Sequence, residues 1–350
     1  SDEVELAEAA GVEDPIGYET VTLTNRTPVA QALAQALHQI GERLNPGPRV
    51  SYDDGALITP NAYVSTLQLG ATLPQILLAG LPNARLEPAA SLFREMQGHK
   101  TEAEIELIHA ACRIGEAGFA AARLTMAPGR TEYEVAGAVV DALTASAGDW
   151  WHRRQGSQDG SLPAGHAGGA WVMSGPNSAL AYRAFAATGT RRLKRGDFVL
   201  VHMNPQVGGF WSDLTRTFVL GEPDPQHRTI LEAVLQARAD SRPAVHSGAT
   251  GRDVDAAARA VLVERGFGEA FKHGLGHGIG FNGISAEDLP SLHPLSEDHL
   301  AAEMCFNIEP AVYIDGLGGC RHCDAIALTS RGTQELSPFF ATLDELVVSI

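Results

Sequence analysis

The sequence predicts a mixed α/β protein, with a small N-terminal α/β domain over residues 1–97 and a larger domain over residues 98–350. Three features lead to this prediction. The first part of the chain alternates short apolar stretches with helical ones. Long helices then begin near residues 101 and 131, and beyond residue 171 strand-forming residues alternate with glycine-rich turns. We therefore expect helices and strands in both domains.

The N-terminal region predicts secondary structure but no chemistry. Apolar stretches at residues 50–52, 56–58 and 84–86 are typical of short strands, and residues 28–42 are typical of a helix. We find no motif with recognisable chemistry among residues 1–97. Function is therefore expected to lie in the second domain.

Helix-capping residues mark the start of the second domain. Thr101 and Glu104 fit a capping box, and apolar residues follow them at helical spacing. Thr131 is the expected N-cap of a second helix, and residues 253–265 predict a third.

The composition is that of a globular protein with an acidic excess. The 350 residues carry 26 Lys and Arg against 42 Asp and Glu, a formal net charge of −16. This charge argues against nucleic acid or an acidic membrane as a partner. No apolar run approaches the roughly 20 residues that a membrane helix needs. Four cysteines are too few for a disulfide scaffold, and the first residues lack a secretory leader pattern, so we expect a cytoplasmic protein.

Residues 198–220 predict a long β-hairpin. Its strands are residues 198–204 and 210–220, and its turn is at residues 206–209. That turn would place His202 directly opposite Asp213, with both side chains on one face of the sheet.

Residues 305–329 predict a second hairpin, which turns about Gly316. Its pairing would place Glu309 opposite Cys323. Each hairpin therefore offers two possible metal ligands side by side.

The segment HGLGHGIG, residues 273–280, lies between the two hairpins. A glycine at every second position disfavours a helix, and an extended chain puts His273 and His277 on one face. Taken alone, each of these polar residues is more often a packed core or strand-edge residue than a ligand. Their joint placement predicts a metal site. The five side chains that can converge are His202, Asp213, His277, Glu309 and Cys323.

Four segments resemble motifs of the pita-bread (M24-type) superfamily, which includes Xaa-Pro aminopeptidases, prolidases, methionine aminopeptidases and creatinase. SDLTRT at residues 212–217 resembles the strand whose aspartate bridges two metals, and GHGIG at residues 276–280 resembles the histidine-ligand segment. IEP at residues 308–310 and GGCRHCD at residues 318–324 resemble the two glutamate-ligand strands. The match covers about residues 98–340 in order, which implies a pita-bread domain behind a creatinase-like N-terminal domain.

The resemblance also shows where this chain departs from the family pattern. The family ligands are Asp, Asp, His, Glu and Glu; the first is His202 here and the last is Cys323. A further family histidine is Tyr182 in this chain, and the proton-shuttling histidine after the ligand histidine is Ile284. The family ligands that remain unchanged are Asp213, His277 and Glu309.

These departures change the expected metal content. Two carboxylates and at most one thiolate supply about −3, which suits one divalent cation better than two, and imidazole and thiolate shift the preference from Mn²⁺ or Mg²⁺ towards Zn²⁺. We therefore expect one Zn²⁺, with Mn²⁺ as the next choice, held by Asp213, His277 and Glu309. Cys323 and His202 are the further candidate ligands.

The resemblance implies hydrolysis of a C–N bond in a small peptide or amide by an activated water. Glu309 is expected to serve as ligand or base, and His273 or Tyr182 to stabilise the oxyanion. Because His202 replaces a family ligand that helps to hold the substrate amine, we do not expect a standard Xaa-Pro aminopeptidase, and an exopeptidase acting from the carboxyl end fits better. Candidate groups for a substrate carboxylate are Arg153, Arg154 and Arg321. The family also implies a homodimer.

Two other functions stay open at this point. One is a metal-free amidinohydrolase that resembles creatinase, and the other is a catalytically silent binding protein. Metal analysis separates the first from a metalloenzyme. A screen of dipeptides, N-acylated amino acids and guanidino compounds separates the second from both enzymes.

Overall fold

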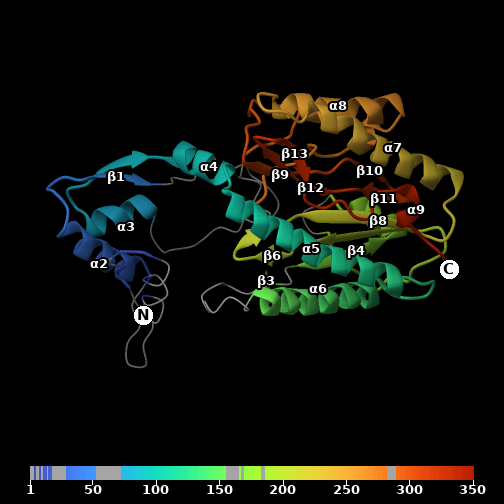
Figure 1. Cartoon of the computed structure of the whole chain (residues 1–350), viewed down its shortest axis with the longest axis horizontal. Helices are drawn as coiled ribbons and strands as arrows, with labels where there is room; N and C mark the ends of the chain where they lie inside the picture. Colours follow the sequence, from blue (N-terminus) through green and yellow to red (C-terminus); the bar gives the residue numbers. More distant parts are fainter. Residues whose placement is uncertain are drawn as a thin grey trace. The chain divides into compact units, whose positions relative to one another are not determined.

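A computed structural model shows how the chain folds (Figure 1). It describes residues 29–52, 72–154, 165–166, 169–182, 186–281 and 289–350, with isolated positions before residue 18; the side chains of residues 149–154 and 165–166 are not part of this description. The contacts divide the chain into two compact units, of which the second holds most of residues 94–350. In the described part of the chain, none of the helices is long and apolar enough to cross a bilayer.

The first unit combines short helices with two short strands. The strands β1 and β2 pair in parallel, and α2 packs against α3. The predicted strands at residues 50–52 and 84–86 lie in or overlap β1 and β2, whereas residues 56–58 lie outside the described residues. The elements up to the start of the second unit are α2 (Val29–Gly41), β1 (Arg49–Tyr52), α3 (Leu73–Gly80), β2 (Arg85–Pro88) and α4 (Ala90–Gly98).

The second unit combines long helices with short strands. Its helices are α5 (Glu102–Thr125), α6 (Glu132–Arg154), η1 (Gly175–Leu180), α7 (Pro225–Ser241), η2 (Arg242–Ala244), α8 (Gly251–Glu264), η3 (Gly268–Ala270) and α9 (Leu343–Leu346). Its strands are β3 (Gly165–His166), β4 (Ala170–Ser174), β5 (Phe198–Met203), β6 (Gln206–Val207), β7 (Phe210–Trp211), β8 (Leu214–Leu220), β9 (Met304–Ile308), β10 (Ala311–Ile314), β11 (Gly318–Arg321), β12 (Asp324–Thr329), β13 (Gly332–Glu335) and β14 (Val347–Val348). The mixed α/β class predicted from the sequence is confirmed.

The predicted helix caps are present. Thr101 Oγ1 accepts from the backbone N–H of Glu104, whose carboxylate accepts from the N–H of Thr101 at 2.7 Å. Thr131 caps α6 in the same way, with Glu134 as its partner. Both caps satisfy backbone donors that a helix start leaves free.

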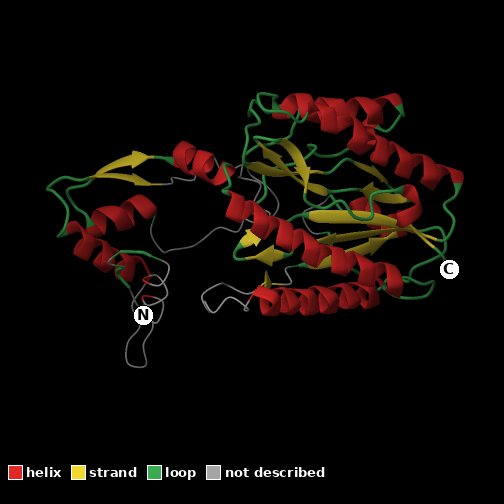
Figure 2. Ribbon diagram, viewed as in Figure 1, coloured by secondary structure: helices red, strands yellow, loops and turns green. Residues whose placement is uncertain are grey.

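Two sheets form the centre of the second unit. One has the order β14-β8-β5-β4 and the other the order β13-β12-β9. The strands lie between the α7–α8 pair and α6, with α5 crossing in front of them (Figures 1 and 2). Every residue of β5 and β8 is buried, as expected for strands covered on both faces. His202 is therefore a polar group in the interior of an apolar strand.

The first hairpin differs from the prediction by two residues. His202 pairs with Thr215, not with Asp213. The turn consists of Gly208 and Gly209 alone, whose φ angles of 60° and 82° require glycine in a two-residue hairpin. Because the shift is even, His202 and Asp213 still belong to the same face.

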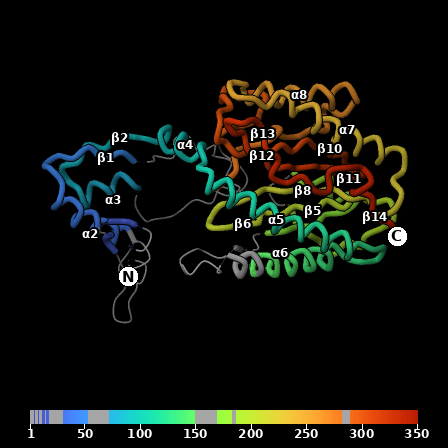
Figure 3. Tube along the Cα trace, in the orientation of Figure 1, coloured from blue at the N-terminus to red at the C-terminus, as the bar shows by residue number. Residues whose placement is uncertain are grey.

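The second hairpin has the predicted register. Ile308 pairs with Asp324, and Ala311 pairs with Arg321, so Glu309 and Cys323 lie at matching positions between these two pairs. Glu309 and Pro310 interrupt the strand at that point. A β-bridge between Thr215 and Cys323 joins the two hairpins. Figure 3 shows β8, from the middle of the chain, and β11, from near its end, in the same part of the second unit.

The fully buried guanidinium of Arg216 binds both segments of this bridge. Arg216 donates to the carbonyl oxygens of Thr215 (2.9 Å) and Cys323 (2.6 Å), and to the carboxylate of Asp324 (2.7 Å). Arg238 also pairs with Asp324. Burial alone would raise the pKa of Asp324, but the charges around it, that of Arg216 first, hold the pKa well below its usual range.

Replacing Asp324 by Asn should destabilise the protein strongly. The change leaves buried guanidinium groups without their carboxylate, a loss of about 3–5 kcal/mol in the free energy of unfolding. Denaturant unfolding measures it. The exposed pair of Arg228 and Glu222 provides the control, since Glu222→Gln should leave the unfolding midpoint unchanged. Equal midpoints for the two variants would contradict the prediction.

Candidate active site

The glycine-rich segment is extended and lies along β9. The N–H of Ile279 donates to Cys305 O, the N–H of Asn307 donates to His277 O, and the N–H of Glu309 donates to Leu275 O. A Cβ on Gly276 would lie 2.1 Å from Asn307 O, so only glycine allows this approach. The extended segment predicted from the glycine spacing is confirmed, and it brings His277 beside the second hairpin.

The side chains of Asp213, Glu309 and Cys323 form one cluster. Each offers an atom that could bind a metal, and these atoms all lie within 4.8 Å of one another. His277 Nε2 is 3.5 Å from Asp213 Oδ2, and Cys323 Sγ is 3.1 Å from Asp213 O and 3.5 Å from Asp213 Oδ1. The structure thus brings together all five residues predicted as metal ligands, since His202 Nδ1 is also only 3.6 Å from Asp213 Oδ1.

The pKa shifts of this cluster come from burial and from the closeness of its acidic groups. Burial and the charge of Asp213 raise the pKa of Glu309 to about 7, although Arg321 opposes this. Burial, Asp213 and Glu309 raise the pKa of the Cys323 thiol well above its usual value. Burial lowers the pKa of His277, but Asp213 outweighs it and raises that pKa to about 9. A cation in the cluster would relieve all three shifts.

His277 is held from two sides. Its Nδ1 lies 2.9 Å from Gly278 O, so Nδ1–H donates to this carbonyl and Nε2 faces Asp213. The buried Asn307 accepts from the His277 backbone N–H at 2.7 Å, and its amide nitrogen is 3.1 Å from Nε2. Fixing a ligand ring through its second nitrogen and its backbone is a common feature of metal sites.

A pair of residues on α8 holds the backbone that leads to His277. Asp255 binds Arg259 in two hydrogen bonds, of 2.8 and 2.9 Å, and accepts from the N–H of Leu275 at 2.9 Å. Arg259 donates to His273 O at 2.9 Å. This pair therefore connects α8 to both ends of a three-residue stretch just before His277.

His202 faces the cluster but is bound to other groups. Its Nδ1 is 3.6 Å from Asp213 Oδ1. The same nitrogen is 2.9 Å from Arg321 Nη2, while Nε2 is 2.9 Å from Asn204 Oδ1. The ring also stacks on Trp171, with centroids 4.3 Å apart. His202 was predicted as a metal ligand, but both of its ring nitrogens already have hydrogen-bond partners in the protein.

The other predicted site residues are spread around the cluster. His273 Nε2 is 3.1 Å from the Tyr313 hydroxyl, and the Tyr182 ring lies 5.1 Å from the Tyr313 ring. The side chains of Arg153 and Arg154 lie outside the described residues, and so does Ile284. Of the three predicted carboxylate-binding arginines, the structure places Arg321 at the cluster.

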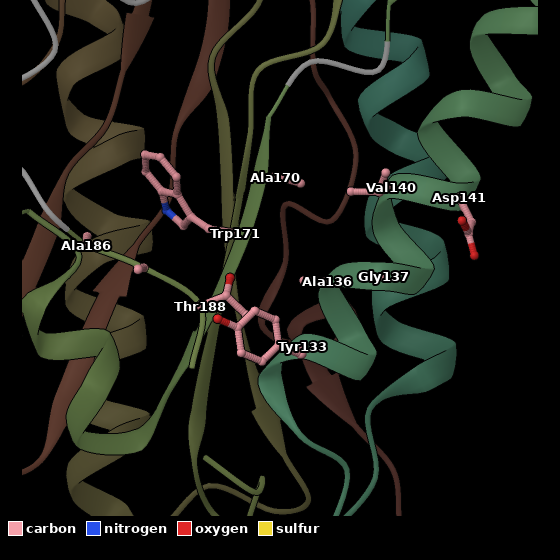
Figure 4. Close-up of a pocket in the computed structure, with 10 residues that line it drawn as sticks. Tyr133, Ala136, Gly137, Val140, Asp141, Ala170, Trp171, Ala186 and Thr188 are labelled. Atoms are coloured by element: carbon pink, nitrogen blue, oxygen red, sulfur yellow. The ribbon is translucent and has the colours of Figure 1, made fainter. Parts of the chain in front are cut away.

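A groove of about 590 Å³ adjoins the site at Trp171 (Figure 4). It runs from α6 round the edge of β4, and Trp171 connects it to His202, on which the indole stacks. Small and apolar side chains line most of it. The lining residues are Tyr133, Ala136, Gly137, Val140, Asp141, Ala170, Trp171, Ala186, Ala187 and Thr188.

Sequence comparisons agree with this arrangement. The sequence model of metallopeptidase family M24 matches residues 106–330. The Xaa-Pro dipeptidase of Pyrococcus horikoshii is 30% identical over 246 residues, which are 70% of this chain and 64% of that protein. The chain belongs to metallopeptidase family M24, a family of hydrolases. It spans just under two thirds of the length of this curated relative.

Solved structures show the same fold. The prolidase of Pyrococcus horikoshii has a TM-score of 0.69 at 26% identity, covering 86% of this chain and 77% of that one. Dipeptidase PepE of Mycobacterium ulcerans has a TM-score of 0.71 at 27% identity, covering 90% and 75%. The X-Pro aminopeptidase of Thermotoga maritima reaches a TM-score of 0.72 at 22% identity, covering 91% and 79%, and supports the fold alone. The resemblance to the pita-bread superfamily is confirmed.

The residues present fit one divalent cation. Asp213 and Glu309 supply oxygen, His277 supplies nitrogen and Cys323 supplies sulfur, a mixture that suits Zn²⁺ better than Mg²⁺. The side chains at the centre keep exposures of 7% for Asp213, 11% for Glu309 and 16% for His277, so solvent reaches a mostly buried site. On the other side of Asp213, the guanidinium of Arg321 already supplies positive charge.

Sequence reasoning missed the residues that support the cluster. Asn307, Asp255 and Arg259 act through contacts between segments that lie far apart in the sequence. The only local signal was the spacing of Asp255 and Arg259, four residues apart on one helix face. Trp171 was noted as the start of the β-rich region, but its stacking on His202 was not predicted.

Replacing Arg259 by Met should weaken Zn²⁺ binding by about tenfold or more, since the backbone before His277 loses its support. Competition with a chromophoric chelator measures the affinity. Arg252→Met is the matched control, because Arg252 lies on the same helix and its ion pair with Glu297 is exposed. Unchanged affinity in Arg259→Met, or an equal loss in both variants, would contradict a specific role.

Proposed function

We propose that this protein is a mononuclear, zinc-dependent hydrolase of peptide or amide C–N bonds that does not act as a standard Xaa-Pro aminopeptidase. The observation that carries the proposal is the buried cluster of Asp213, His277, Glu309 and Cys323, whose possible ligand atoms lie close together. Membership of family M24 supports a metallohydrolase. In this proposal, residues 1–97 are the N-terminal domain and residues 98–350 the catalytic domain of a cytoplasmic homodimer.

The metal ligands in this proposal are Asp213, His277 and Glu309, with Cys323 as a fourth. When bound, the cation polarises the scissile carbonyl and lowers the pKa of water. The protein positions the ligands by the bridge between Thr215 and Cys323 and by the hydrogen bonds along β9.

Glu309 is the candidate general base. In that role its carboxylate would take a proton from water and return it to the leaving nitrogen. Tyr182 is the candidate donor to the oxyanion. His273 Nδ1–H donates to Gly274 O, and its Nε2 is paired with the Tyr313 hydroxyl, so His273 would act by orienting Tyr313.

The difference from a standard Xaa-Pro aminopeptidase rests on His202. The family position is an aspartate that helps to hold a first metal and the substrate amine, whereas the imidazole here is bound to Arg321 and Asn204. A dinuclear site would therefore lack one carboxylate at His202 and another at Cys323.

Asp213→Ala and His277→Ala should each lose the metal and nearly all activity, because two or three ligands leave the site under-coordinated and short of charge. Elemental analysis after dialysis should give one equivalent of zinc in the wild type and well below one in each variant. Full activity of both variants in metal-free buffer would instead favour the creatinase-like alternative.

The double variant His202→Asp with Cys323→Glu should bind a second metal when Mn²⁺ is in excess. The two substitutions add up to two negative charges and restore oxygen ligands, which Mn²⁺ prefers. Isothermal titration measures the stoichiometry, and the wild type serves as the control. Two equivalents retained by the wild type would contradict the mononuclear proposal.

A further inference from the structure

Arg321 and His202 form a cationic corner beside Asp213 and Glu309. Arg321 Nη2 is 2.9 Å from His202 Nδ1, and Nε is 3.1 Å from Thr215 Oγ1. Nη1 lies 3.7 Å from Glu309 Oε2, which is an ion pair and too long for a hydrogen bond. The guanidinium side chain is 9% exposed, close to the value for Glu309. It therefore lies at the same depth as the candidate catalytic groups.

The hydrogen bonds of the corner fix the charge of His202. His202 Nδ1 lies 2.9 Å from both Arg321 Nη2 and Thr215 Oγ1; a guanidinium can only donate, so Nδ1 accepts, and Nε2–H then donates to Asn204 Oδ1. The imidazole is thus neutral. The corner therefore carries the positive charge of Arg321, and the carboxylates beside it are those of Glu309 and Asp213.

This arrangement changes which substrate group the corner can receive. An ammonium or a second divalent cation would meet a buried guanidinium there, and like charges repel strongly where water is mostly excluded. A carboxylate would meet the N–H groups of Arg321 that remain beside those used by His202 and Thr215, and a guanidinium is a strong donor to carboxylates. Its closest protein competitor, Glu309, is held by the 3.7 Å ion pair alone.

We propose that the Arg321–His202 corner binds the free carboxylate next to the scissile amide, so that the substrates are N-acylated amino acids and amine-blocked peptides with a free C-terminus. The inference rests on the proposed function and names its substrate class. In such a substrate the carboxylate lies three bonds from the scissile carbonyl carbon, a short span that suits groups as close as Arg321 and Glu309. Hydrolysis adds water across the C–N bond: oxygen joins the acyl carbon, and the leaving amine takes a proton.

Four forms of one dipeptide test this preference. They are alanyl-leucine, N-acetyl-alanyl-leucine, alanyl-leucinamide and N-acetyl-alanyl-leucinamide, assayed with the metal-loaded full chain. The N-acetylated acid should have a kcat/KM about tenfold or more above that of alanyl-leucinamide, the range expected for hydrogen bonds to a charged group. An amide form cleaved as well as or better than the N-acetylated acid would overturn the inference.

His202→Asp tests the corner by placing a carboxylate beside Arg321. An aspartate beside Arg321 neutralises the guanidinium, so the advantage of the carboxylate forms should fall by about tenfold. His246→Asp makes the same change at an exposed position and should keep the wild-type preference. An unchanged preference in His202→Asp would show that the corner does not bind the carboxylate.

A binding measurement separates the failure of this inference from the failure of the proposed function. Isothermal titration with 4-methylpentanoate and 4-methylpentylamine compares an anion and a cation of similar shape that cannot be hydrolysed. The wild type should bind the carboxylate and not the amine, and His202→Asp should bind the carboxylate about tenfold more weakly. Carboxylate binding without hydrolysis of any dipeptide form would refute the proposed function and support carboxylate binding by the corner. Hydrolysis with a preference for free amines would support the proposed function and refute carboxylate binding by the corner.

Discussion

The buried guanidinium of Arg216 is the interaction on which the site depends. It bonds the carbonyl oxygens of Thr215 and Cys323, the two residues that form the only bridge between the hairpins in the described part of the chain. The carboxylate of Asp324 balances its charge. A buried cation with several protein acceptors costs a great deal to misplace, because each acceptor would lose its partner away from water. Arg216 therefore fixes how the strand that carries Asp213 meets the one that carries Cys323.

The sequence was sufficient for the second hairpin but not for the first. In the second, the turn about Gly316 places Glu309 and Cys323 at matching positions, as found. In the first, four candidate turn residues allowed more than one register. The tightest turn, Gly208 and Gly209, was the correct one, since their positive φ angles match the twist of a two-residue hairpin. The predicted register was wrong by two residues, but the predicted face of each side chain was correct, because side chains in a strand alternate between faces with a period of two.

The supporting residues could not be predicted, because their role depends on contacts between distant segments. Asn307 alternates with core residues on β9 and gives no sign in the sequence that it binds His277. His202 also shows that contacts between distant segments decide the role of a residue. Its residue type and position predicted a metal ligand, and only the structure reveals that Arg321 uses its lone pair. Charge and hydrogen-bond donors nearby, not the residue itself, decide what an imidazole does.

The bridge between the hairpins also has a consequence for folding. Asp213 and Cys323 are 110 residues apart in the chain, and Arg216 and Asp324 are 108 apart. Contacts of such sequence separation form late, because the entropy of closing the intervening chain must be lost before they stabilise anything. The helices and each hairpin can form from local contacts, whereas the cluster exists only once both hairpins have docked. The candidate metal site is thus a property of the completely folded chain, and we do not expect it in a fragment that lacks either hairpin.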